Sequence, residues 1–281
     1  MRSDRKILGG VAALVSVASL TLTACEEARP DPDISLSPPS SNVAPGQVTI
    51  EYIAHAAFRI RSPNGTQVII DPFADRVWLG YDFPDSLDAD AVLITHPHYD
   101  HDAGERMGRS FPWGTEVEVI RDPGSHTVGD ISIHGIEGKH ADPYGKEFGQ
   151  TNTIFVLEVA GLRIAHLGDN GPLTEANVLA LGHVDILMMP ADAEYHILSA
   201  EATEANLTAV HPRVLIPMHY RHPDLEPSLD GPEDLGPIDP WLAGRSNVQR
   251  HTGHMKIFSA ATLPKREIVL VLSHSPDVIR P

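Results

Sequence analysis

The sequence is poor in thiols and in positive charge. Cys25 is the single cysteine among 281 residues, which excludes an intramolecular disulfide and any metal site built from several thiolates. Lys and Arg number 21 against 38 Asp and Glu, so the formal net charge is −17. A surface of this sign repels phosphate backbones, and we therefore expect no nucleic-acid partner. No internal repeat of fixed short period is present either.

The first 24 residues are predicted to be a signal peptide. The basic start MRSDRK precedes the uncharged stretch ILGGVAALVSVASLTLTA, an order typical of secretory signals. Gly, Ser and Thr dilute this stretch, which disfavours the alternative of a retained transmembrane anchor. It ends in LTAC, residues 22–25, which resembles the bacterial lipobox. We therefore expect an extracytoplasmic lipoprotein, held at the bacterial cell envelope by acyl chains on Cys25.

Residues 25–46 are rich in proline and follow neither the helical nor the strand period, so an extended tether is predicted there. The folded domain is expected to span residues 47–281. A total hydrophobic content of 42% is typical of a globular chain with a sizeable core.

The order of the predicted elements indicates an α/β fold. Several strands come first, and strands then alternate with helices, which predicts mixed sheets with helices outside them. Helices are predicted at 172–182 and 199–210. The predicted strands lie at 48–53, 56–61, 66–71, 90–95, 116–120, 130–136, 184–190, 213–220 and 266–273, with two more within 153–169. Residues 221–253, rich in Pro, Asp and Gly, leave open either a lid or a long surface loop.

The stretch THPHYDHD, residues 95–102, concentrates metal-binding side chains directly after an apolar strand. His96, His98 and Asp100 alternate, so in an extended segment they point to one side. His101 faces elsewhere unless the chain turns, and such a turn could serve a second metal ion. Asp102 is expected to be structural. The alternative for the whole stretch is a solvated polar loop.

Three further candidates stand at the ends of predicted strands, where active-site residues tend to lie: His140, Asp169 and His219. Taken singly, each has an ordinary structural explanation. His140 could be a surface residue, Asp169 a turn former before Asn170 and Gly171, and His219 a half-buried imidazole in a hydrogen bond. Their value lies in the combination with the histidine-rich stretch.

This combination, HxHxDH followed by a single His, a GD pair and a strand-end His, resembles the metallo-β-lactamase superfamily over most of residues 47–220. The segments YIAHAAFRI, IIDP, LGDNG and IPMHY resemble its lactonase and N-acylphosphatidylethanolamine phospholipase D-like branch. The resemblance implies a four-layer αββα sandwich of two mixed β-sheets. It departs from the family at PADAEYH, residues 190–196, where a glycine-rich segment is common.

The resemblance also implies a binuclear centre. The implied ligands are His96, His98 and His140 for the first ion, Asp100, His101 and His219 for the second, and Asp169 as a bridge. His55 and Asp71 match family positions and are expected to orient ligands or to serve the structure. Imidazoles and carboxylates suit two divalent ions, with Zn²⁺ expected and Mn²⁺ or Fe as alternatives.

The expected activity is hydrolysis of an ester, lactone or phosphodiester by a metal-bound hydroxide, on a small-molecule or lipid-like substrate. Asp100 should orient the hydroxide. His196 is the first candidate for protonating the leaving group, with the alternative that it is a surface histidine; the other candidates are Tyr99, Tyr195 and Tyr220. A true β-lactamase and a non-catalytic metal-binding lipoprotein are the rival hypotheses.

Overall fold

The computed structural model describes residues 44–74, 78–85, 87–103, 117–141, 150–222, 224–225 and 235–278. The predicted signal peptide, Cys25 and most of the predicted tether lie outside these ranges. Among the described residues, no helix is both long enough and apolar enough to cross a bilayer.

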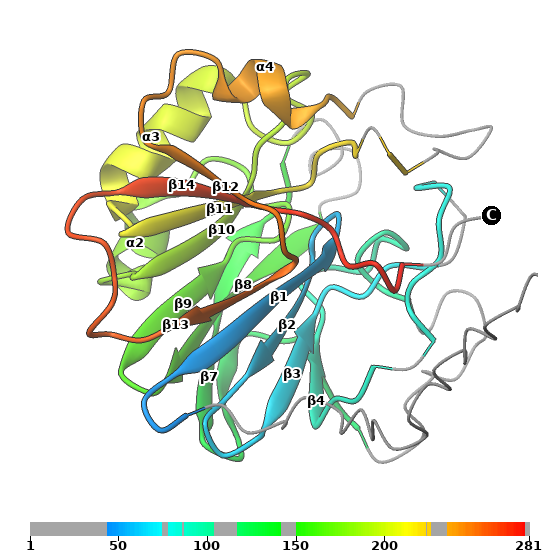
Figure 1. Cartoon of the computed structure of the whole chain (residues 1–281), viewed down its shortest axis with the longest axis vertical. Coiled ribbons are helices and arrows are strands. Elements are labelled where there is room, and N and C mark those ends of the chain that lie inside the picture. The colour runs from blue at the N-terminus through cyan, green and yellow to red at the C-terminus, as the bar shows by residue number, and fades with distance from the viewer. Residues whose placement is uncertain are drawn as a thin grey trace, which may run out of the picture. The chain divides into compact units, whose positions relative to one another are not determined.

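The first of two mixed sheets has six strands in the order β13-β1-β2-β3-β4-β5 (Figure 1). β2 and β3 have alternating sequences and pair in antiparallel orientation. The turn between them contains Gly65, whose φ of 91° suits glycine. β3 and β4 then pair in parallel, so both end at the same edge of the sheet. The strands are β1 (Val48–Ala54), β2 (Ala57–Arg61), β3 (Gln67–Ile70), β4 (Ala91–Leu93), β5 (Glu118–Ile120) and β13 (Met255–Phe258).

The second sheet has eight strands in the order β12-β14-β11-β10-β9-β8-β7-β6. From β12 to β9 every neighbouring pair is parallel, and from β9 to β6 every pair is antiparallel. β7 therefore runs in the same direction as β9, and the carboxyl ends of six strands meet at one edge. The strands are β6 (Gly124–Val128), β7 (Ile131–Lys139), β8 (Thr151–Val159), β9 (Leu162–His166), β10 (Ile186–Pro190), β11 (Val214–Met218), β12 (Val248–His251) and β14 (Ile268–Leu272).

The main hydrophobic core joins the two sheets. Ile50 and Phe58 from the first sheet and Ile164 and Leu187 from the second belong to one cluster of fully buried side chains. A second cluster, which includes Ile69 and other residues of the first sheet, covers that sheet's other face. The central strands β10 and β11 are buried at every position, as expected for parallel strands covered on both sides.

Three helices are described: α2 (Glu175–Leu181), α3 (Ala200–Val210) and α4 (Ile238–Leu242). α2 begins after a capping box of Thr174 and Asn177, and the Ser199 side chain caps α3 by accepting from the backbone N–H of Ala202. α2 packs against β7 and α3, which places it on the eight-stranded sheet.

The two mixed sheets with attached helices confirm the predicted α/β fold. Both predicted helices are present within a few residues of the expected ends. The sequence did not indicate β6, β12, β13 or α4. The described residues 235–253 are not a long loop, because they include α4 and the edge strand β12.

Candidate metal centre

The predicted ligands come together at one edge of the sandwich, from both sheets. His96, His98, Asp100 and His101 follow β4 in the first sheet. The other three follow strands of the second sheet: His140 follows β7, Asp169 follows β9 and His219 follows β11. Side chains from four separate strand ends therefore converge, which the solvated-loop alternative does not predict.

The first predicted set, His96, His98 and His140, forms a compact group of imidazoles. One ring nitrogen from each lies within 4.8 Å of the others. His96 Nε2 lies 3.0 Å from His98 Nδ1. The rings of His96 and His98 each stand nearly edge-on to that of His140, at 4.7 and 4.8 Å between centroids. Three nitrogens facing one point match the donor set for a divalent ion.

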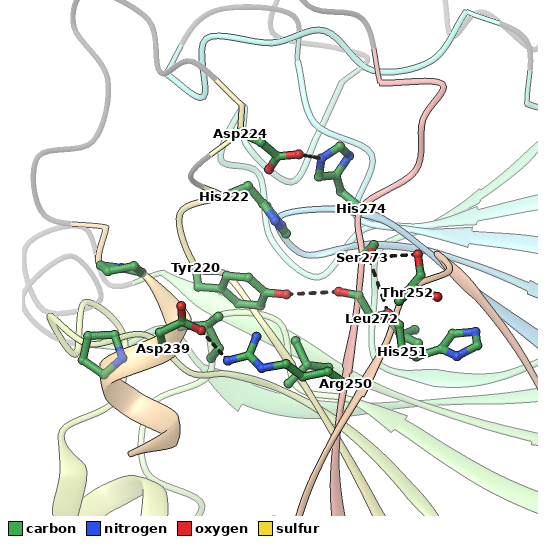
Figure 2. Close-up of a pocket in the computed structure, with 14 residues that line it drawn as sticks. Tyr220, His222, Asp224, Asp239, Arg250, His251, Thr252, Leu272, Ser273 and His274 are labelled. Carbon is green, nitrogen blue, oxygen red and sulfur yellow. Dashed lines mark hydrogen bonds and ion pairs between the residues drawn. The ribbon is translucent and has the colours of Figure 1, made fainter.

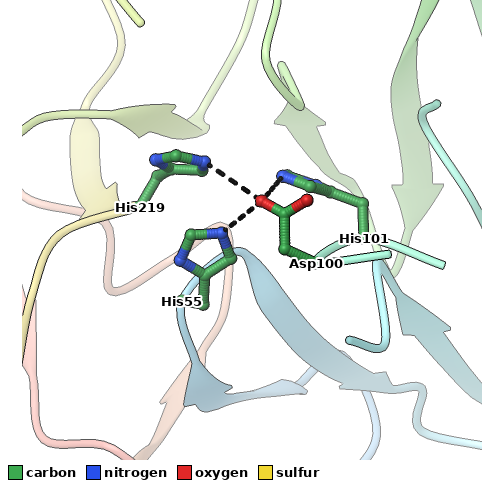
Figure 3. Close-up of side chains that lie close together, drawn as sticks. All are labelled: His55, Asp100, His101 and His219. Carbon is green, nitrogen blue, oxygen red and sulfur yellow. Dashed lines mark hydrogen bonds and ion pairs between the residues drawn. The ribbon is translucent and has the colours of Figure 1, made fainter. Parts of the chain in front are cut away.

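The second predicted set, Asp100, His101 and His219, converges together with His55 (Figure 3). Asp100 Oδ2 lies 3.4 Å from His101 Nε2 and 3.8 Å from His219 Nε2. His55 Nε2 is closer to that oxygen, at 3.1 Å, and forms a hydrogen bond with it. His55 therefore holds the Asp100 carboxylate in place, in agreement with its predicted orienting role.

Asp169 lies between the two sets. Its Oδ2 is 3.8 Å from His96 Nε2 and 3.6 Å from His140 Nε2 on one side, and 3.2 Å from His219 Nε2 on the other. Its Oδ1 is 3.3 Å from His101 Nε2. A carboxylate that faces both imidazole groups has the position needed to bridge two ions.

Two further aspartates have different roles: Asp71 directly follows β3, and Asp102 is the last residue of the histidine-rich stretch. Asp71 Oδ2 accepts from His101 Nδ1 at 2.8 Å and from the Thr95 hydroxyl at 2.7 Å, which directs His101 Nε2 into the cluster. Asp102 points away and pairs with Arg121. The structural role predicted for Asp102 and the orienting role predicted for Asp71 both agree with these contacts.

Three residues of the cluster and its surroundings have a left-handed backbone conformation at the end of a strand. The φ angles are 55° for His55, 47° for Asp71 and 59° for His219, each directly after a strand. Such conformations are disfavoured for residues with a Cβ by about 1–2 kcal/mol. A backbone hydrogen bond of 2.9 Å from His219 N–H to the His55 carbonyl joins two of these turns across the sheets.

Burial and neighbouring charges set the protonation of the cluster. Burial lowers the pKa of His96 well below its usual value, and the charge of His101 lowers it further. Burial acts to raise the pKa of Asp169, but His101 and His219 lower it well below the usual value. Burial acts to lower the pKa of His219, yet Asp169 and Asp100 raise it to about 9. Ionised carboxylates therefore face imidazoles, the arrangement that a cation would stabilise.

Several buried polar atoms in the cluster also fit a metal. His101 Nε2, His219 Nε2 and Asp169 Oδ1 take part in no hydrogen bond within the described part of the chain. A buried polar atom that makes no hydrogen bond costs about 1–3 kcal/mol. All three atoms face the cluster, where divalent cations would satisfy them.

A small pocket of about 170 Å³ opens onto the cluster. Beyond four predicted ligands, its described lining consists of Trp78, Tyr99 and His196. The His196 ring stacks on His219 at 5.6 Å between centroids with 11° between the planes. His196 is therefore placed at the site rather than on a remote surface. The sequence did not single out Trp78, because no local pattern distinguishes it.

Tyr195 and Tyr220, named as alternative proton donors, are not part of the described lining of this pocket. Tyr220 instead lines a separate cavity of about 600 Å³ at the carboxyl ends of β11, β12 and β14 (Figure 2). Its hydroxyl points to the Leu272 carbonyl at 3.5 Å, with the ion pairs Asp224–His274 and Asp239–Arg250 around it.

The sheets and the histidine–aspartate cluster define the class of protein. A family model described as the Beta-lactamase superfamily domain matches residues 49–219, and the chain belongs to this family. It is a metal-dependent hydrolase of the metallo-β-lactamase superfamily with a His/Asp metal-binding cluster, so the non-catalytic alternative is set aside.

Two relatives that are both called UPF0173 metal-dependent hydrolase support this assignment. The chain is 26% identical over 238 residues to a UPF0173 metal-dependent hydrolase of Myxococcus xanthus, covering 74% of this chain and 84% of that protein. It is 28% identical over 195 residues to one of Thermococcus onnurineus, covering 62% of this chain and 84% of that protein. A crystal structure of a metallo-β-lactamase superfamily protein from Thermotoga maritima matches with a TM-score of 0.59 and 28% identity. That match covers 81% of this chain and 100% of the other.

Proposed function

We propose that the enzyme binds two divalent ions, Zn²⁺ in the first instance, and cleaves a carboxylic ester or a lactone. The proposal rests mainly on the position of Asp169 between the two imidazole groups. Its oxygens lie 3.2–3.8 Å from four of their nitrogens. His96, His98 and His140 would hold the first ion, and Asp100, His101 and His219 the second. When bound, such ions lower the pKa of a shared water and polarise the electrophile.

The lining of the pocket favours a carbonyl substrate over a phosphodiester. Phosphate recognition generally uses Arg, Lys or clustered backbone N–H groups. Among the described residues the lining contains no Lys or Arg; Trp78 and Tyr99 provide aromatic surface instead. The whole chain is also strongly negative, at −17. The aromatic part of the lining therefore suits an ester or lactone with an apolar group, whereas a phosphodiester would meet positive charge only at the bound ions.

Two side chains have roles beyond holding metal. Asp100 is held by His55 and lines the pocket. Its carboxylate can orient a water molecule by accepting a hydrogen bond from it. His196 stands at the pocket on the ring of His219 and can protonate the leaving oxygen. A lactone or alkyl ester needs this step most, because an alkoxide is a poor leaving group.

The proposal extends to branch and location. The HYDHD and LGDNG segments support a place in the lactonase and N-acylphosphatidylethanolamine phospholipase D-like branch. The LTAC segment supports lipidation at Cys25 and an extracytoplasmic position at the envelope, where the enzyme would meet diffusible or lipid-like esters.

The test combines metal analysis with a substrate comparison. Purified protein, prepared without added metal or chelator, should contain close to two equivalents of divalent metal per chain. p-Nitrophenyl butyrate and a γ-lactone should be hydrolysed faster than bis(p-nitrophenyl) phosphate or nitrocefin, and chelation should abolish the activity reversibly. Preference for the phosphodiester would refute the carbonyl assignment, and preference for nitrocefin would favour a β-lactamase.

A further inference from the structure

The loop after β10, residues 191–199, places His196 at the pocket, and its backbone includes an unfavourable left-handed residue. Tyr195, directly before His196, has a φ of 55° and is 42% exposed. The His196 ring lies 5.8 Å from Trp78 and 5.6 Å from His219 between centroids. A loop that contains a left-handed residue with a large side chain needs other contacts to keep this shape.

Asp192, the second residue of the loop, supplies these contacts. Its Oδ1 accepts from the backbone N–H of Glu194 at 2.8 Å, and its Oδ2 accepts from that of His196 at 3.2 Å. Oδ1 also accepts from the backbone N–H of Gly236 at 3.2 Å. The side chain is only 2% exposed. One buried carboxylate therefore organises three backbone N–H groups, including that of His196 itself.

Gly236 connects this loop to the strand end that carries a predicted metal ligand. A Cβ at Gly236 would lie 2.5 Å from Glu194 N and 2.9 Å from Ala193 N, so only glycine permits this close approach. Its carbonyl accepts from Arg221 N–H at 2.9 Å, two residues after His219. Asp192 and Gly236 thus fix the His196 loop and the His219 segment against each other.

We propose that Asp192 is a positioning residue, whose carboxylate holds the His196 loop so that the imidazole stands over the pocket and can protonate the leaving group. This inference rests on the proposed esterase or lactonase function. The aspartate lies within PADAEYH, where this sequence departs from the glycine-rich segment common in the family.

The experiment compares Asp192→Ala with His196→Gln, using an ester pair that differs in leaving group. p-Nitrophenolate leaves without a proton, whereas ethoxide needs one. Both variants should lose about 100-fold or more in kcat on ethyl butyrate and much less on p-nitrophenyl butyrate. The double variant should lose no more than His196→Gln alone, because both changes remove one contribution.

A matched control and a second readout separate positioning from general damage. Asp185 is a buried aspartate just before β10, at the strand's other end, and it accepts from Arg163 N–H at 2.9 Å. Asp185→Asn should affect both esters equally or not at all. Chymotrypsin cleavage after Tyr195, located by mass spectrometry, should be about tenfold faster in Asp192→Ala than in wild type, since the loop opens more often. Metal content should not change.

Asp192→Asn keeps one acceptor oxygen and serves if the alanine variant does not fold; it should show the same selectivity for the poor leaving group. Equal losses on both esters, or loss of metal, would overturn the inference, as would unchanged cleavage after Tyr195. If wild type hydrolyses neither of these esters nor a γ-lactone, the proposed function fails, and the cleavage rates alone decide whether Asp192 holds the loop.

Discussion

Replacing Asp71 with asparagine should weaken metal binding without changing a ligand. Both carboxylate oxygens of Asp71 act as acceptors: Oδ1 from Thr95 N–H at 2.8 Å and Oδ2 from His101 Nδ1 at 2.8 Å. An asparagine offers one oxygen and one NH₂ group, so one of these donors must face another donor. If the NH₂ faces His101, the imidazole proton moves to Nε2, the nitrogen that faces the cluster.

The size of the effect follows from this mismatch. Removing such an orienting partner usually costs about 10- to 100-fold in metal affinity, which corresponds to about 1.4–2.7 kcal/mol. We expect this loss at the second site, where His101 lies, and little loss at the site of His96, His98 and His140. Competition with a chromophoric chelator, resolved into two binding steps, measures both dissociation constants.

Asp102→Asn is the matched control, because Asp102 is equally buried and adjacent to His101 but points to Arg121. It should leave both dissociation constants within a factor of about two, in the range of ordinary substitutions away from a site. Wild-type affinity at both sites in Asp71→Asn would refute the inferred orientation of His101. An equal loss in both variants would mean that general destabilisation is being measured.

Three further outcomes are expected. Asp169→Ala should abolish turnover and lower the metal content while circular dichroism stays close to wild type; full activity would refute the ligand assignment. Cys25→Ser should release the protein from membranes or block its processing, and wild-type fractionation would contradict lipidation. Burial, with the charge of His274, lowers the pKa of His222 to about 3. The unfolded state then binds the extra proton, so stability falls as pH drops from about 6.5 to about 3. In metal-free protein, urea unfolding should show a shallower fall for His222→Gln, and an unchanged slope would refute this assignment.

The sequence predicted best what burial and periodicity determine. β10 and β11 are continuous apolar runs, and the expected Ser199 caps the start of α3, because central strands and capped helices carry strong local signals. The seven ligand candidates could be named because histidines and aspartates at strand ends are conspicuous and because their order resembles a known family. Their convergence needed the structure.

Features that depend on distant partners could not be predicted. β6 and β12 are edge strands with mostly exposed or half-buried residues, so they lack the alternation that marks a strand. Trp78 gains its role only because the fold places it beside His55 and His196. The contact of Asp192 with Gly236 spans 44 positions, and no local pattern announces it.

Because the predicted ligands come from both sheets, metal binding and the stability of the fold are coupled. His96 and His101 belong to one sheet, His140 and His219 to the other, and Asp169 faces both groups. Metal bound there would link the two sheets and would stabilise the fold according to its free concentration, by about 2.7 kcal/mol per ion at a hundredfold excess over its Kd. The free energy of unfolding of this enzyme would then depend on the free metal concentration around it.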